Sequence, residues 1–380
     1  METTTNLVGQ EILEVLYSPV KAFRKIIEKP DLKGVLLVLL FVISSTVALQ
    51  FVYNSKQLYE NRMPENDNWT ESVTNQHVWT STGLISLDST NYQIGNNSIS
   101  SSAINVTSIW LKLTGINPIN CSEATGYTEL TFWIKWTNEN GLSSSGKLKL
   151  FSGSEDSYFQ TDLNNLLVSN GEWGNSTLKV GSNQGWASNN SPDWENITGI
   201  EFSLMWSESA DLTINIDGLF FKNFISPIES VGLSEATLYI FISVSFSIGI
   251  NWVLFAGILL IVSKLFSEEV GQWNVFFIII GHAFIATAVY TLVSALIFTS
   301  LPILNMPIEA DLQIAVFSAL WLPNLAYQTG TIILWAGEVW VAALGAIVIR
   351  LLKNTTWGKA VTISLIAFVI RFILRFFFGF

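Results

Sequence analysis

The chain has 380 residues, of which 49% are hydrophobic and 13% charged. This charged fraction is about half that of an ordinary soluble domain and is typical of a membrane protein. The formal net charge of -11 argues against the clustered Lys and Arg with which proteins bind nucleic acid, so we predict no nucleic-acid partner. The single cysteine, Cys121, excludes an internal disulfide and a Cys-rich zinc site.

The first segment, residues 1–33, is polar and amphipathic. Ser18 followed by Pro19 is a helix-start signal, and Phe23 and Ile27 then recur at helical spacing beside basic residues. Because a hydrophobic span follows directly, we predict an interfacial helix on the cytoplasmic side of a membrane. An ordinary soluble amphipathic helix is the alternative.

The first predicted membrane span covers residues 34–53. The run from Gly34 to Val52 is uncharged and long enough to cross a hydrocarbon core of about 30 Å. The basic residues Lys21, Arg24, Lys25, Lys29 and Lys33 precede it, whereas only Lys56 and Arg62 follow closely. The positive-inside rule therefore places the N-terminus in the cytoplasm and the segment after the span outside the cell.

Residues 235–380 are predicted to form the rest of a membrane bundle. Apolar runs at Leu238–Val262, Trp273–Thr299, Thr331–Ile349 and Ala360–Phe378 give four further spans. Pro323 and Gly330 interrupt the apolar stretch before the fourth span, which predicts a half-helix near 312–326. The fold class is thus a membrane α-helical bundle of about five transmembrane helices.

The segment 68–222 has a different chemistry, rich in Asn, Ser, Thr, Gly and Trp. Residues alternate with period two in Leu130–Trp136, Ile200–Trp206 and Leu212–Asp217, and Asn138–Gly141 is a turn signal. This pattern predicts an inserted, extracellular, all-β sandwich.

The membrane segments resemble the Yip family in its prokaryotic and archaeal form. The matching residues are Ser18–Phe23, Glu28–Pro30, Leu322–Asn324, Trp335, Gly345 and Trp357–Ala360. The resemblance implies five spans and, in the eukaryotic members, contacts with Rab GTPases in vesicle trafficking. The long insert departs from the compact eukaryotic pattern, so only the topology is carried over.

The insert resembles jelly-roll carbohydrate-binding modules of the concanavalin-like and galactose-binding kind. The resemblance rests on Gly95–Ile99, Leu130–Trp136, Trp194–Phe202 and Ile216–Phe220. It implies a jelly roll that holds a structural calcium, with Asp217 as a ligand. A carboxylate that caps the backbone before Gly218 is the alternative, and no other cofactor is predicted.

Aromatic side chains in polar surroundings are candidates for stacking on sugars. If Phe132 and its alternate neighbours fill the core, Trp133 and Lys135 point outward, and Trp186 lies in a polar loop. We take these three as glycan-binding candidates, with an ordinary packing role as the alternative. Sequons at Asn68, Asn96, Asn105, Asn120, Asn175, Asn189 and Asn196 predict a glycoprotein at the cell surface.

Two opposite charges lie within predicted spans. Glu338 and Arg371 are each about 18 Å from the cytoplasmic boundary, counted along the helices. We predict that they form an intramembrane pair with Asn251 and His282 at similar depth, because a charge in lipid needs a partner. A structural ion pair is one interpretation, and a proton or substrate pathway is the other.

No catalytic residues are predicted, because two histidines far apart in sequence suggest no hydrolase triad. We predict a non-enzymatic scaffold or accessory subunit of the cell membrane, whose external sandwich binds a glycan or a protein. Its partners would be the lipid bilayer, other membrane proteins in a larger complex, and surface glycans. The alternative is a transporter or channel component that uses Glu338 and Arg371.

Overall fold

The computed structural model describes residues 12–73, 78–122, 126–139, 141, 143, 145–268 and 272–378. The chain divides into two compact units. The helical unit combines Met1–Tyr59 with Ile225–Phe380, and the β unit is Glu60–Phe224. The β unit thus interrupts the sequence of the helical unit, and it begins eight residues before and ends two residues after the segment 68–222.

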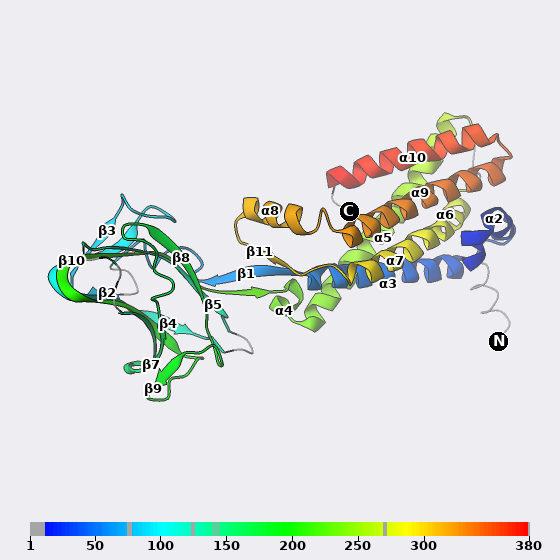
Figure 1. Ribbon diagram of the computed structural model, residues 1–380. Helices are drawn as coiled ribbons and strands as arrows, with labels where there is room; N and C mark the ends of the chain where they lie inside the picture. Colours follow the sequence, from blue (N-terminus) through cyan, green and yellow to red (C-terminus); the bar gives the residue numbers. More distant parts are fainter. Residues whose placement is uncertain are drawn as a thin grey trace. The chain divides into compact units, whose positions relative to one another are not determined.

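The elements of the helical unit are α2 (Pro19–Glu28), α3 (Leu32–Ser55), α4 (Pro227–Val231), α5 (Leu233–Leu265), α6 (Trp273–Gly281), η1 (His282–Phe284), α7 (Ile285–Phe298), β11 (Leu304–Met306), α8 (Ala310–Leu320), α9 (Leu325–Lys353) and α10 (Trp357–Phe378) (Figure 1). Five helices in the described ranges are long and apolar enough to cross a membrane: α3, α5, the segment α6–η1–α7, α9 and α10. This agrees with the number of spans predicted from hydropathy.

The five long helices form a closed ring. Helix α3 contacts α7, α7 contacts α9, α9 contacts α10, α10 contacts α5, and α5 returns to α3. Large side chains such as Phe255, Phe276 and Phe284 fill part of the space between them and are almost fully buried. Each helix therefore presents one side to the middle of the ring.

Helix α2 packs against the bundle. Its side chains Ala22, Phe23 and Ile26 are buried in the core of the helical unit, and the helix contacts α6 and α9. Pro19 occupies the first turn as the sequence indicates, but the Ser18 side chain makes no capping hydrogen bond. The apolar face that the sequence assigns to the membrane interface is therefore covered by other helices.

Helix α9 corrects the prediction that the chain is interrupted at Gly330. The helix already begins at residue 325, where the Asn324 side chain accepts a hydrogen bond of 2.9 Å from the Ala326 N–H. Gly330 lies inside the helix, and its carbonyl accepts a 2.9 Å hydrogen bond from Ser294 Oγ of α7. The glycine thus serves a close helix–helix contact, while the half-helix predicted near 312–326 corresponds to α8.

The strands of the β unit are β1 (Gln57–Met63, which begins in the helical unit), β2 (Val78–Ser81), β3 (Leu84–Asp88), β4 (Ser98–Ile119), β5 (Glu129–Thr137), β6 (Ser145–Ser152), β7 (Ser154–Asp162), β8 (Trp173–Lys179), β9 (Ala187–Asn189) and β10 (Ile197–Ile225). Antiparallel pairing gives one layer in the order β2-β4-β10-β6-β7-β9 and a second in the order β3-β4-β10-β5-β8. The long strands β4 and β10 run through both layers (Figure 1). Register shifts in β10 between Met205 and Leu212 mark the bend.

The core of the β unit lies between the two layers. Phe132 of β5 meets Phe202 of β10 edge to face, with ring centroids 5.0 Å apart. Phe132, Ile134 and Trp136 are all buried, whereas the residues between them are half-buried. The predicted alternation is therefore confirmed, and the unit is an antiparallel β-sandwich.

Candidate functional site

The outward face of the first layer carries a row of charged side chains. Pairing places Lys112 of β4, Glu201 of β10 and Lys149 of β6 side by side in register. Their sequence neighbours Leu111 and Phe202 are buried, so these side chains point away from the core. Lys149 Nζ lies 2.9 Å from Glu201 Oε1, so the row is held by an ion pair across strands.

Aromatic rings flank this row. Lys112 Nζ lies 5.3 Å from the ring centroid of Trp110, and Lys149 Nζ lies 5.2 Å from that of Tyr158. Both rings are half-buried, which leaves part of each exposed to solvent. We call Trp110, Lys112, Lys149, Tyr158 and Glu201 the aromatic–charged face.

A glycine makes room for a further ring on the same side of the sheet. Gly199 pairs in register with Phe151, whose ring lies edge to face with Tyr158 at 6.4 Å. A Cβ at position 199 would come within 3.1 Å of Phe151 Cδ2 and 2.8 Å of the Leu113 carbonyl oxygen. The absence of a side chain on β10 therefore lets the Phe151 ring lie across the strand.

The predicted candidates Trp133 and Lys135 point outward from β5 but are partly covered. Lys135 Nζ donates a 3.0 Å hydrogen bond to Asn91 Oδ1, in the loop between β3 and β4. A Cβ on Gly218 would lie 3.1 Å from Trp133 Cδ1 and 2.6 Å from Ile94 Cδ1, so the same loop reaches over this part of the sheet. The two residues flank a packed loop, which favours the packing alternative.

Trp186 is also a packing residue in this structure. Its indole N–H donates a 2.9 Å hydrogen bond to the Lys179 carbonyl, and its ring meets Trp194 edge to face at 5.8 Å. Trp194 in turn stacks on Phe159 with 3.7 Å between centroids. Trp186 therefore closes an aromatic cluster at the margin of the core.

Asp217 does not fit the calcium ligand that the resemblance implies. Its buried carboxylate accepts hydrogen bonds from the Gly218 N–H at 2.7 Å, the Ile94 N–H at 2.9 Å, Thr70 Oγ1 at 3.2 Å and the Gln93 N–H. Four donors use the lone pairs that a cation would need. In the described part of the chain there is also no group of three or more His, Cys, Asp and Glu placed for a metal. Backbone capping is thus the role that the geometry supports.

A second carboxyl, that of Asp67, lies close to Asp217. Thr70 Oγ1 is 2.5 Å from Asp67 Oδ1 and 3.2 Å from Asp217 Oδ1, while Asp67 Oδ2 is buried without a hydrogen-bond partner. Burial, together with the nearby Asp217 charge, raises the pKa of Asp67 from 3.8 to about 7. Asp67 therefore binds a proton in the folded state in mildly acidic solution.

This shift predicts a pH-dependent stability. The unfolded Asp67 ionises near 3.8, so its contribution is complete below that pH and is lost as the pH rises through about 7. Between pH 5 and pH 8 we expect the free energy of unfolding of the β unit to fall by about 2 kcal/mol. Tryptophan fluorescence during denaturation of the full chain measures it. Asp67→Asn should remove this loss, and an unchanged pH profile in that variant would contradict the assignment.

The predicted glycosylation sites differ in exposure. The side chains of Asn68, Asn96, Asn105, Asn175 and Asn189 are exposed, whereas Asn120 and Asn196 are half-buried. Asn120 Oδ1 accepts a 2.8 Å hydrogen bond from the Ser122 N–H. Glycosylation of any of them stays a prediction, and we expect the exposed asparagines to be modified more readily than the half-buried ones.

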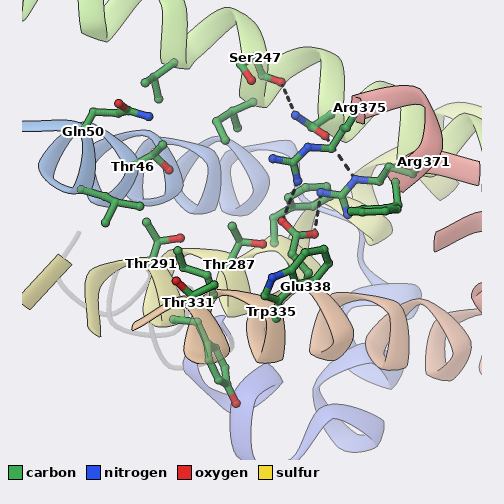
Figure 2. A pocket seen from close by; sticks show the side chains of 18 of the residues that line it. Thr46, Gln50, Ser247, Thr287, Thr291, Thr331, Trp335, Glu338, Arg371 and Arg375 are labelled. Carbon is green, nitrogen blue, oxygen red and sulfur yellow. Dashed lines mark hydrogen bonds and ion pairs between the residues drawn. The ribbon is translucent and has the colours of Figure 1, made fainter. Parts of the chain in front are cut away.

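In the helical unit the structure brings Glu338 of α9 and Arg371 of α10 together, with Oε2 3.0 Å from Nη2 (Figure 2). Sequence reasoning missed a second cation: Arg375 Nη1 lies 3.0 Å from Glu338 Oε1. Asn251 Oδ1 accepts a 3.3 Å hydrogen bond from Arg371 Nε, as its predicted depth suggests. The Arg371 guanidinium also stacks over Phe255, 5.2 Å from its ring centroid.

His282 does not join this cluster. Its Nδ1 is 3.0 Å from the Ile278 carbonyl oxygen, one turn back along the same segment. A Cβ on Gly34 of α3 would lie only 2.7 Å from His282 Nε2, so the ring packs against that glycine. His282 was predicted to lie at a similar depth to Glu338 and Arg371, but it does not contact them because its helix directs the side chain toward α3.

The charged cluster lines a cavity of about 660 Å³ inside the helical unit. All five long helices contribute to its wall: Thr46, Leu49 and Gln50 from α3; Ser243, Val244, Ser247, Ile248 and Asn251 from α5; Thr287, Tyr290 and Thr291 from α7, with Phe284 before it; Thr331, Leu334, Trp335 and Glu338 from α9; and Phe368, Arg371, Phe372, Arg375 and Phe376 from α10. Figure 2 shows Thr46, Thr287, Thr291 and Thr331 around the same space. The middle of the helix ring thus holds a cavity at this level, lined by both polar and apolar side chains.

Comparisons with known proteins do not identify the chain. No family model and no curated protein matches it, so the resemblance to the Yip family stays a prediction. Solved structures that are similar include a family 11 carbohydrate-binding module from Clostridium thermocellum in complex with a β-1,3-1,4-mixed-linked tetrasaccharide (12% identity, TM-score 0.30, 44% of this chain and 95% of that one). The family 30 carbohydrate-binding module of a cellulosomal cellulase from Clostridium thermocellum is another (16%, 0.30, 44% and 98%).

A third similar structure is a β-1,2-glucanase from Parabacteroides distasonis (10% identity, TM-score 0.31, 41% of this chain and 24% of that one). At such identities and TM-scores these structures assign neither a ligand nor an activity to this chain.

Proposed function

We propose that this chain is a non-catalytic cell-membrane protein that displays a glycan-binding β-sandwich. The helical unit would cross the membrane five times with the N-terminus in the cytoplasm, and the β unit would lie outside. The five long apolar helices and the basic residues that precede α3 support this orientation.

The aromatic–charged face is the observation that carries the proposal. Sugars are bound by aromatic faces that stack on C–H groups, beside polar groups that bond hydroxyls. Trp110 and Tyr158 offer partly exposed rings, and Lys112, Lys149 and Glu201 offer donors and acceptors in fixed register between them. An accessory or scaffold role would follow if the bound glycan belongs to a neighbouring surface or protein.

We expect Trp110→Ala and Tyr158→Ala each to weaken glycan binding by roughly fivefold, since one ring contact contributes about 1 kcal/mol. The measurement is binding of the purified full chain to a glycan array, followed by titration of the best ligand. Trp186→Ala serves as the matched control, because its ring packs on the core and should leave affinity unchanged.

Loss of binding in Trp186→Ala but not in Trp110→Ala would show that the glycan binds near Trp186 and not on the aromatic–charged face, which would contradict the proposal. Binding of a protein rather than a glycan to the same face would contradict the ligand class. A transporter or channel role for Glu338 and Arg371 stays a prediction beside this proposal.

A further inference from the structure

We propose that the cavity between the five long helices binds the phosphate of an anionic lipid whose headgroup carries hydroxyls. The phosphate would lie against Arg371 and Arg375, and the headgroup hydroxyls against the Ser and Thr wall. This site lies in the helical unit and does not depend on glycan binding by the β unit.

The charges in the wall favour an anion. Glu338 uses its two oxygens to hold two guanidinium groups, each at 3.0 Å. Arg371, Arg375 and Glu338 are the only Asp, Glu, Lys, Arg or His side chains among the described lining residues. Two guanidinium groups thus share one carboxylate in the wall, and an anion beside the buried Arg371 would give that charge a second partner in a low-dielectric bundle.

Two buried polar atoms in the wall have no hydrogen-bond partner. The Arg371 side chain is only 4% exposed, and although its Nε and Nη2 are bonded, Nη1 is not. Thr287 Oγ1 is buried and unpaired in the same way. Leaving a buried donor unsatisfied costs about 1–3 kcal/mol, so both atoms indicate an oxygen-rich ligand.

The wall is amphipathic, which favours a lipid over a free anion. Trp335, Phe372 and Phe376 line the cavity and are also exposed on the helical unit, with Trp335 and Phe372 rings 5.3 Å apart. Hydroxyl and amide groups occupy the α3, α5 and α7 parts of the wall. A volume of about 660 Å³ suits a headgroup, and the exposed aromatic side chains would contact acyl chains outside it.

The test uses the full chain in a neutral detergent, with phosphatidylglycerol and phosphatidylcholine added in equal amounts and bound lipid measured by native mass spectrometry. We expect at least tenfold preference for phosphatidylglycerol. Arg375→Gln, which keeps the Glu338–Arg371 pair, should reduce its retention at least tenfold. Thr287→Val should reduce it about threefold. Lys264→Gln, which removes a cation outside the cavity, should leave it unchanged.

Three results would overturn the proposal. Equal retention of both lipids would show that the cavity has no preference for an anion. An equal loss of bound phosphatidylglycerol in Lys264→Gln and Arg375→Gln would show that only the overall surface charge matters. Inorganic phosphate at millimolar concentration that displaces the lipid completely would show a free anion site instead. Trp110→Ala should keep the lipid preference, because Trp110 lies in the β unit. The lipid site and the glycan site can therefore be tested independently.

Discussion

Glu338→Gln is expected to lower the free energy of unfolding by about 3–5 kcal/mol, because it removes the counter-charge of the buried Arg371 guanidinium inside the helix ring. Arg371 cannot escape to solvent, since its side chain is 4% exposed and lies between Phe255 and Phe284. Unfolding of the purified chain in mixed micelles, titrated with denaturing detergent, gives the change directly.

The matched control is Glu268→Gln, which breaks the 2.8 Å ion pair with Lys359. The Lys359 side chain is 36% exposed, so water can solvate it once the partner is gone, and the loss should stay below about 1 kcal/mol. Adding Arg371→Met to Glu338→Gln should recover part of the stability by removing the buried charge. Equal losses in the two single variants would contradict the cost of leaving the buried Arg371 charge without its carboxylate.

Gly330→Leu is expected to cost about 3 kcal/mol, at the upper end of overpacking effects. A Cβ at this position would lie 2.1 Å from Phe298 Cε1, and the Gly330 carbonyl is held by Ser294 of α7. A leucine side chain at position 330 would therefore force α7 and α9 apart. The same detergent titration measures the loss.

Gly257→Leu is the control, because a Cβ on Gly257 of α5 meets nothing within 4 Å. We expect it to change stability by less than about 0.5 kcal/mol or to stabilise α5 slightly, since leucine is a better helix former than glycine. Phe298→Ala should partly rescue Gly330→Leu by vacating the space. If both glycine variants behaved alike, the close approach of the two helices would be wrong.

Local patterns predicted much of this architecture. Hydropathy gave the five long helices, and the two-residue period of Leu130–Trp136 gave the buried side of β5. Both predictions succeed because the pattern of apolar and polar residues along a helix or strand shows which of its side chains are buried. Gly330 shows the limit, since a glycine that breaks a helix and one that lets two helices touch look the same in sequence.

The charged cluster was only partly predictable. Depth along a helix follows from counting residues, and this brought Glu338 and Arg371 together. The direction of a side chain around the helix does not follow from depth, which is why His282 was wrongly included. Arg375 was missed, although it lies one turn after Arg371 and so shares its face.

The aromatic–charged face depends on strand register between distant segments. Lys149 and Glu201 are 52 residues apart, and nothing local pairs them. The alternation around Trp110 could have indicated an outward ring, because Ile109, Leu111 and Leu113 are buried on the other side. The residues that lie beside Trp110 come from distant parts of the sequence, so they could be identified only from the folded structure.

The orientation of the β unit is best tested by cysteine labelling of intact cells with a membrane-impermeant maleimide. The native Cys121 should stay silent, because burial raises the pKa of its thiol to about 12. Leu84→Cys, at a side chain 78% exposed in the β unit, should be labelled in intact cells. Lys29→Cys precedes α3, on the side that we propose to be cytoplasmic, and should react only after permeabilisation. Labelling of Lys29→Cys in intact cells with Leu84→Cys protected would contradict the proposed external sandwich.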